Sequence, residues 1–265
     1  MSDFDLQMLW KKEIQILDVI DSICKKHNIT YFLVWGTLLG SVRHKGFIPW
    51  DDDVDIGMPR KSYNKFLKIA SKELGKEYFL QTGLTDKWHP VPFSKVRMNN
   101  TAFYTVGDKN IKRHHGIFVD IFPMNRRNAK PSLLNRVADR ITAHIAQRRN
   151  EAPLTVFRFL KFFSTSFLVR IRDFLLSGHG DFYLCDGALL RVSDFESSVS
   201  GQFEGKQYPI PKNYHNVLET LYGDYMQLPS EENRVAHSPA CISFNLNEDK
   251  EELEKYLKTL KKGDL

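Results

Sequence analysis

Trp50-Asp51-Asp52-Asp53-Val54-Asp55-Ile56 is the most informative stretch of the sequence, because it places four carboxylates within five residues of a chain that is basic overall. Like charges at this spacing repel one another, so stability alone gives no reason to assemble them. A hard divalent cation does give one, because Mg²⁺ takes oxygen ligands and commonly combines one or two carboxylates with substrate phosphates. The run therefore indicates a metal site.

The alternation of polar and apolar residues in this run separates carboxylates expected within a strand from those expected before it. Residues 53–58 alternate in the manner of a strand, so Asp53 and Asp55 would share one face while the apolar residues between them point into the core. Carboxylates roughly 7 Å apart along a strand can hold one or two cations. Asp51 and Asp52 are expected just before the strand. The alternative is a solvated acidic loop, which would not normally alternate with apolar residues.

A phosphate-binding turn is expected upstream of the acidic run. Residues 30–35 are apolar and aromatic and predict a buried strand, which ends at Gly36-Thr37 and is followed by a helical turn or short helix at 38–43. A glycine at such a turn lets the backbone approach a phosphate, and a helix N-terminus offers free N–H groups. Capping of the helix would explain Thr37 equally well.

Asp120 is the candidate for a third carboxylate at the site. It lies within the apolar run 115–122, which predicts another buried strand. A carboxylate inside such a strand is costly unless it is paired or bound to a metal. An ion pair with an arginine is one explanation, and metal ligation beside Asp53 and Asp55 is the other.

The remaining pattern predicts a mixed α/β or α+β core over residues 1–125, followed by a mainly helical region over 126–265 that packs on it across a soft boundary. In the first part we expect helices at 6–27 and 61–74, and strands at 78–82, 93–98, 101–106 and 117–122. In the second part we expect helices at 132–149, 213–222 and 247–262, with short alternating stretches between 178 and 207.

Composition excludes several classes of protein. The chain has 265 residues, 42% hydrophobic and 26% charged, which is ordinary for a globular protein. Its three cysteines form no CxxC pair, so we expect neither a disulfide framework nor a zinc site, and a reducing cytoplasm is the natural location. Neither a signal peptide nor a run of about 18 apolar residues is apparent. The net charge of +6 points only weakly to an anionic partner.

The order of these features resembles that of the nucleotidyltransferase fold, in which a Gly-Ser or Gly-Thr turn holds phosphate and three acidic residues hold a divalent metal. The block from Tyr31 to Ile56 resembles the signature of the LicD family, bacterial phosphocholine transferases related to fukutin-type phosphopentitol transferases. The resemblance covers residues 30–237, although 130–200 carry no motif of the family and are expected to hold acceptor specificity. Further matching pieces are Lys95-Val96-Arg97, Gly116 to Pro123, Tyr208 to Lys212, Leu221 to Met226 and Leu228-Pro229.

The resemblance implies transfer of phosphocholine from CDP-choline to a hydroxyl of a cell-surface glycan, with release of CMP. The acceptor would be a teichoic acid, a lipooligosaccharide or a capsule precursor, either free or lipid-linked. It also implies Mg²⁺ or Mn²⁺ held by Asp53, Asp55 and Asp120, and a donor diphosphate held by Gly36 and Thr37.

Five further residues are expected around this site. Arg43, Lys95 and Arg97 are the basic residues that we place nearest to the diphosphate, because a forked guanidinium suits phosphate oxygens. Asp51 and Asp52 have two open roles. One of them could accept the proton of the acceptor hydroxyl, or both could tune the metal site.

Alternative functions remain open at this point. One is transfer of ribitol, glycerol or ethanolamine phosphate from another CDP-linked donor. Another is a nucleotide- or RNA-binding module without turnover, which the three carboxylates argue against, so we expect no nucleic acid partner. Residues 155–176 are apolar and aromatic with interspersed basic residues. We prefer a core helix for them, and the alternative is peripheral contact with the inner face of a membrane.

Overall fold

The computed structural model describes residues 3–89, 91–105, 113–149, 157–176, 178–234 and 239–249, together with residues 251 and 254. Its central feature is a mixed sheet built from β1 (Phe32–Leu33), β2 (Asp55–Pro59), β3 (Tyr78–Gln81), β4 (Ser94–Met98), β6 (Phe118–Arg127), β7 (Phe182–Cys185) and β8 (Ala188–Arg191). Within these ranges the sheet is seven-stranded, with the path β1-β2-β6-β4-β3, and β7 joins β6 to β8. β2 and β6 run parallel, whereas their other partners are antiparallel.

Helices α1 (Asp3–Lys26) and α3 (Arg60–Glu73) pack against this sheet and against each other. The apolar stripe of α1 includes Leu9, Ile16 and Ile20, which recur at helical spacing and are fully buried. In α3, the Tyr63 hydroxyl shares a hydrogen bond with the hydroxyl of Ser94 in β4. Each buried apolar side chain contributes about 1.5–3 kcal/mol, so these contacts fix both helices to the sheet.

Helix α2 (Trp35–Arg43) follows β1 directly. Gly36 and Thr37 therefore lie in its first turn, and the strand expected at 30–35 is reduced to two residues. Trp35 has a φ of 50°, which bulky residues seldom adopt. This conformation turns the chain abruptly from β1 into α2 and brings Gly36 to the end of the sheet.

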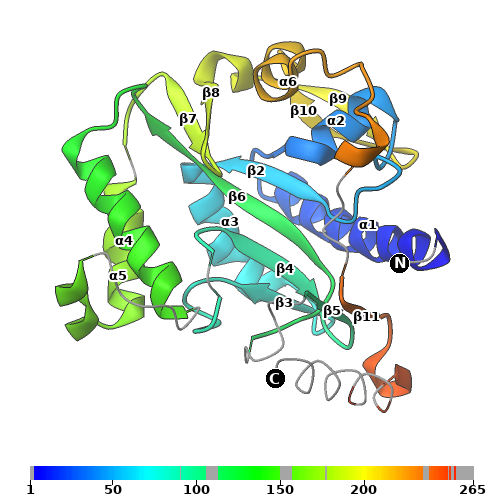
Figure 1. Cartoon of the computed structure of the whole chain (residues 1–265), viewed down its shortest axis with the longest axis horizontal. Helices are drawn as coiled ribbons and strands as arrows, with labels where there is room; N and C mark the ends of the chain where they lie inside the picture. Colours follow the sequence, from blue (N-terminus) through cyan, green and yellow to red (C-terminus); the bar gives the residue numbers. More distant parts are fainter. Residues whose placement is uncertain are drawn as a thin grey trace.

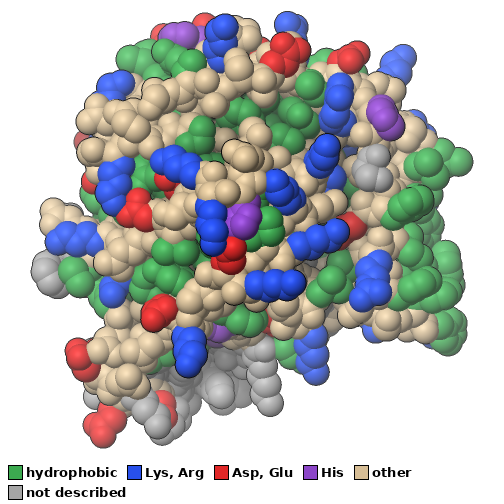
Figure 2. All heavy atoms as spheres, turned by 180° about the vertical axis from the view of Figure 1, so that it is seen from behind, with side chains coloured by type: hydrophobic (Ala, Val, Ile, Leu, Met, Phe, Trp, Pro, Cys, Tyr) green, Lys and Arg blue, Asp and Glu red, His purple; other side chains and the backbone are tan. Residues whose placement is uncertain are grey.

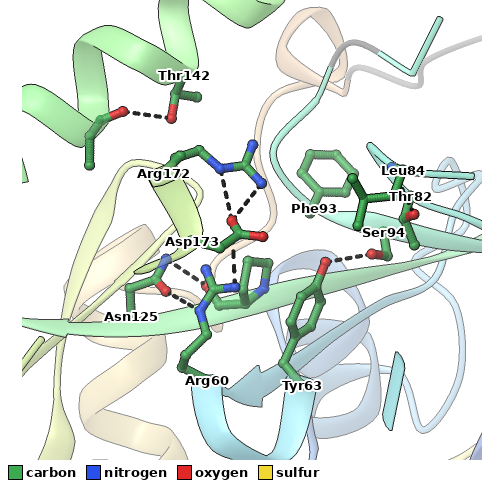
Figure 3. A network of polar contacts seen from close by, with 12 residues as sticks. Arg60, Tyr63, Thr82, Leu84, Phe93, Ser94, Asn125, Thr142, Arg172 and Asp173 are labelled. Atoms are coloured by element: carbon green, nitrogen blue, oxygen red, sulfur yellow. Dashed lines mark hydrogen bonds and ion pairs between the residues drawn. The ribbon is translucent and has the colours of Figure 1, made fainter. Parts of the chain in front are cut away.

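Two helices of the second half form a separate layer. Helices α4 (Leu133–Arg149) and α5 (Thr165–Leu175), with the 3₁₀ turn η2 (Arg158–Phe162), share a small apolar cluster. Figure 3 shows how α5 is fastened to the core. Arg172 donates to Asp173 Oδ1 at 2.9 and 2.7 Å, Arg60 lies 4.0 Å from the same oxygen, and Arg60 also donates to Asn125 Oδ1 of β6 at 2.6 Å.

The rest of the second half closes the other end of the sheet. Figure 1 shows α4 and α5 on one side of β6 and the last elements on the other. Ser41 of α2 donates to the carbonyl of Gln202 at 2.8 Å, which joins α2 to this unit. The unit that contacts α2 consists of η3 (Val192–Phe195), β9 (Ser198–Phe203), β10 (Lys206–Pro211), α6 (Tyr214–Tyr222) and η4 (Glu231–Asn233), with β9 and β10 paired. Further along the chain, β11 (Cys241–Ser243) pairs with β5 (Ala102–Tyr104).

The expected α+β fold is confirmed, with differences in the second half. Helices form at 133–149 and 214–222 as expected, but residues 182–211 contribute four strands, so this half is less helical than predicted. The boundary suggested near residue 126 falls within β6, because β7 extends the sheet along the end of that strand. Val106 and most of the helix expected at 247–262 lie outside the described residues. None of the described helices is both long and apolar enough to cross a bilayer.

Candidate active site

Three charged side chains form a row across adjacent strands. Asp55 of β2 is the register partner of Asp120 in β6, and Asp120 is the register partner of Lys95 in β4. Register partners point to the same face of a sheet, so the three side chains lie side by side. Lys95 Nζ is 2.6 Å from Asp120 Oδ1 and donates to Oδ2 at 2.8 Å. The ion pair predicted as one explanation for Asp120 is therefore present, with a lysine in place of an arginine.

A second cation stands beside this row. Arg97 follows Lys95 on the same face of β4, and both lie over the ring of Phe118, at 4.8 and 3.5 Å from its centre. Arg97 is buried and donates to Gln81 Oε1 at 2.5 Å and to the Gly116 carbonyl at 2.6 Å. Its guanidinium is thus held in place. Together with Asp53, the cations and Asp120 line a cavity of about 220 Å³.

The acidic run itself is a fixed segment that leads into β2. The strand begins at Asp55, so Asp53 lies just before it and not within it as predicted. The backbone of Asp51 is held twice, since its N–H donates to the Ile48 carbonyl at 2.8 Å and its carbonyl accepts from Trp10 Nε1 at 2.9 Å. Asp52 is fully buried. The four carboxylates therefore differ in environment.

Gly36 and Thr37 have different structural roles at the site. A Cβ at Gly36 would stand 2.5 Å from Asp51 Oδ2, so the glycine makes room for that carboxylate. Thr37 is buried, and its hydroxyl accepts a hydrogen bond from the Asp55 N–H at 2.8 Å. Thr37 thereby joins α2 to the first residue of β2. Its side chain holds this junction in place. It lines neither the cavity described above nor the larger one described next.

A larger cavity of about 570 Å³ lies beside Asp51 at the beginning of the acidic run. Gly36, Arg43 and Asp51 line it, together with Trp50 and Tyr222. Arg43 Nη1 donates to the Tyr225 carbonyl at 2.8 Å, which links α2 to the segment after α6. The basic residues predicted for the diphosphate are thus divided: Arg43 faces the larger cavity, while Lys95 and Arg97 face the smaller one.

Burial and neighbouring charge both act on the ionisable groups of the row. Burial raises the pKa of Asp55 well above its ordinary value, and the nearby charges of Asp53, Asp120 and Asp51 raise it further, while Lys95 opposes this. Burial also lowers the pKa of Lys95, against the influence of Asp120. Negative charge is therefore crowded at the start of β2, and one lysine does not offset it.

The donors suit a hard divalent ion. Asp53, Asp55 and Asp120 offer carboxylate oxygens only, which is the ligand chemistry of Mg²⁺ and Mn²⁺. In the described part of the chain, no three His, Cys, Asp or Glu side chains are already gathered as a metal-binding group. Because Lys95 is paired with Asp120, a cation would compete with that lysine for the carboxylate.

Three further residues, not predicted from the sequence, lie near the carboxylates of the site. Burial raises the pKa of Glu13, and the charges of Asp53, Asp52, Asp51 and Asp55 add to this. A signal for Glu13 existed, because it falls on the apolar stripe of α1 between Leu9 and Ile16.

The other two come from the second half. Tyr222 is 42% exposed, and partial desolvation together with the charges of Asp55, Asp51 and Asp53 raises its pKa. Asp186, in the β7–β8 turn, is also exposed, and partial desolvation raises its pKa, with a further contribution from the charge of Asp120. Tyr222 belonged to a matching motif with no assigned role, while Asp186-Gly187 carried only a turn signal.

Comparison with known proteins identifies the family of this chain. Residues 28–165, just over half of the chain, match the family model described as LicD/FKTN/FKRP, nucleotidyltransferase domain. The chain belongs to the LicD/FKTN/FKRP family. The matched residues contain the whole Asp55-Asp120-Lys95 row. They also contain Asp51, which lines the larger cavity, and Asp53, which lines the smaller one. The resemblance recognised in the sequence is thereby confirmed.

Named relatives of this LicD-family chain cover different parts of it. Lipopolysaccharide cholinephosphotransferase LicD of Haemophilus influenzae strain Rd is 27% identical over 247 residues, covering 84% of this chain and 92% of that protein. Uncharacterized proteins of Rickettsia typhi and Rickettsia prowazekii are 43% and 50% identical over 63 and 44 residues. These shorter matches cover 23% and 17% of this chain, and 20% and 16% of the relatives.

Proposed function

We propose that this chain transfers phosphocholine from CDP-choline to a hydroxyl of a cell-surface glycan, with release of CMP and with Mg²⁺ or Mn²⁺ at the acidic run. The observation that carries the proposal is the Asp55-Asp120-Lys95 row, which sets carboxylates and a cation on one face of the sheet, with Asp120 and Lys95 lining the smaller cavity. The cholinephosphotransferase named among the relatives supports the choice of donor.

The two cavities suggest how donor and acceptor are arranged. The larger one, at about 570 Å³, has the size of a typical small-molecule site, and we place the donor there with its diphosphate near Gly36 and Arg43. Lys95 and Arg97 would then face the transferred phosphoryl group from the smaller cavity and balance its charge. A bound divalent ion, held by Asp53, Asp55 and Asp120, would supply further charge neutralisation at the phosphate oxygens.

Asp51 is the better candidate for the group that takes the proton of the acceptor hydroxyl. Its carboxylate lies against Gly36 and lines the larger cavity. Asp52 is fully buried and its side chain lines neither cavity. Asp52 would therefore act on the charge of the site rather than on the acceptor.

A donor screen tests the proposed function. Purified protein is mixed with a bacterial glycan extract and Mg²⁺ or Mn²⁺, and CMP release is measured from CDP-choline, CDP-ethanolamine, CDP-ribitol and CDP-glycerol. We expect CDP-choline to give the fastest release, and chelation with EDTA to stop it. Preference for another CDP-alcohol would overturn the phosphocholine assignment. Binding of CDP-choline without metal-dependent turnover would favour the non-catalytic binding module.

A further inference from the structure

Five phenylalanines are exposed on the outer side of the α4–α5 layer. We call them the aromatic patch, and Figure 2 shows hydrophobic side chains gathered along the edge of the molecule that this layer forms. A contiguous apolar surface of this kind usually marks an interaction site, whereas single exposed apolar residues do not. The members and their exposed fractions are Phe159 (59%), Phe162 (81%), Phe163 (44%), Phe167 (46%) and Phe174 (78%).

The exposed phenylalanines of α5 and its buried core residues lie on different sides of the helix. Leu168 and Val169 point to α4 and are buried in the small apolar cluster. Phe167 and Phe174 are seven residues apart, so they lie on one side of the helix, away from that cluster. Phe163, just before the helix, stacks on Phe167 with ring centres 5.5 Å apart. The preferred reading of this segment as a core helix thus holds for one side of α5 only.

Basic side chains accompany the patch. Lys161 and Arg170 are exposed, and Lys161 Nζ lies 5.1 Å from the centre of the Phe162 ring. Arg170 falls between Phe167 and Phe174 on the same side of α5. The carboxylates of the described part of this layer are both paired with arginines, Asp139 with Arg127 at 3.6 Å and Asp173 with Arg172 at 2.7 Å. The patch therefore presents apolar rings with positive charge.

We propose that the aromatic patch docks on the surface of an anionic phospholipid bilayer. Its rings would enter the boundary between head groups and acyl chains, while Lys161 and Arg170 contact the head groups. Charge decides between this occupant and a second copy of the chain. In a symmetric dimer through this patch, the same positively charged surface would lie on both sides of the interface, and like charges across an interface are unfavourable.

Docking would hold the active site at a fixed distance from the membrane. The Arg172-Asp173-Arg60-Asn125 network fastens α5 to β6, the strand that carries Asp120 (Figure 3). The patch and the charged row are thus parts of one connected framework. A lipid-linked acceptor would then meet a site whose distance from the bilayer is fixed.

Vesicle flotation with the full chain tests this docking. The vesicles consist of phosphatidylcholine alone, or of equal parts phosphatidylcholine and phosphatidylglycerol, at low and high salt. We expect binding to the anionic vesicles at low salt and much weaker binding in the other conditions. F162S/F174S should weaken it about tenfold or more. K161E/R170E should weaken it by more than about 25-fold, because the loss of each basic residue near such a surface costs about fivefold and the two new carboxylates add repulsion.

Matched variants separate docking from general surface effects. L84S/V199S changes two exposed apolar residues elsewhere, and K61E/K72E changes two exposed lysines of α3. Both should bind as the wild type does, and CMP release with a water-soluble acceptor should stay unchanged in F162S/F174S. Absence of binding to anionic vesicles at low salt, or equal binding by patch and control variants, would overturn the proposal. So would a dimer in sedimentation velocity that F162S/F174S dissociates.

Discussion

Single residues set the charge and the space of the site. Gly36 leaves room for the Asp51 carboxylate, Thr37 holds the start of β2, and Lys95 partly balances Asp120. Glu13 adds a buried carboxyl group behind the acidic run. Each of these roles depends on one atom or one proton, so conservative substitutions should separate them.

Replacing Gly36 with alanine should impair activity more than stability. The new Cβ would collide with Asp51 Oδ2 at 2.5 Å and displace that carboxylate from the larger cavity. Small displacements of groups at a reacting centre are costly, so we expect CMP release to fall about tenfold or more while the melting temperature changes little. Gly75→Ala is the matched control, because its Cβ would also meet a carboxylate, that of exposed Glu77. Equal losses in both variants would contradict this role of Gly36.

Glu13 should make stability depend on pH. Its pKa is raised in the folded chain, so the folded state keeps a proton that the unfolded state loses above the ordinary pKa of 4.5. Stability contributed in this way is full below that pH and is lost as the pH rises toward the folded pKa. One such group changes the free energy of unfolding by at most about 1.4 kcal/mol per pH unit.

Urea unfolding of the metal-free protein from pH 5 upward measures this effect. We expect Glu13→Gln to flatten the decline, because the amide cannot ionise. Glu77→Gln, on an exposed residue, should leave the slope of the wild type. A wild-type slope in Glu13→Gln would show that Glu13 is not the group responsible.

At the scale of the elements, the sequence predicts the order better than the boundaries. The helix–strand order around the acidic run and the strand carrying Asp120 follow from hydrophobic periodicity, and these elements hold the predicted carboxylates. The start of β2 was misplaced by two residues, since alternation continues through Asp53 although pairing with β1 and β6 begins later. The Lys95-Asp120 pair depends on the register of β4 and β6, which joins residues 25 apart and has no local signal.

The junction of α2 and β2 gives a prediction about stability. Thr37→Val removes the hydroxyl that accepts from the buried Asp55 N–H, and leaving such a donor unpaired costs about 1–3 kcal/mol. Thr37→Ser keeps the acceptor and should lose much less. Urea unfolding of the three proteins measures the difference. A valine variant as stable as the serine variant would mean that the bond does not support the junction.

At the scale of the whole molecule, the two halves of the chain share one core. Tyr183, Cys185, Phe203 and Ile210 are buried in the same cluster as residues of α1 and β2. β7 also pairs with the last residues of β6. The chain should therefore fold as a unit, in spite of the change in sequence pattern near residue 126.

A fragment of residues 1–128 tests this unity. It would expose the apolar surface that the second half covers and would leave the end of β6 unpaired. We therefore expect no cooperative thermal transition and poorly dispersed amide signals in the NMR spectrum. The full chain should unfold in a cooperative transition under the same conditions. A fragment with dispersed amide signals and a sharp transition would instead show an independent first domain.

Binding of Mn²⁺, followed by electron paramagnetic resonance in the presence of CDP-choline, shows whether the carboxylates of the acidic run and β6 hold a divalent ion beside the donor. We predict saturable binding by the wild type and by Glu77→Gln, and binding weakened about tenfold or more in Asp55→Asn and Asp120→Asn. Equal binding in all four proteins, or none in the wild type, would contradict the account.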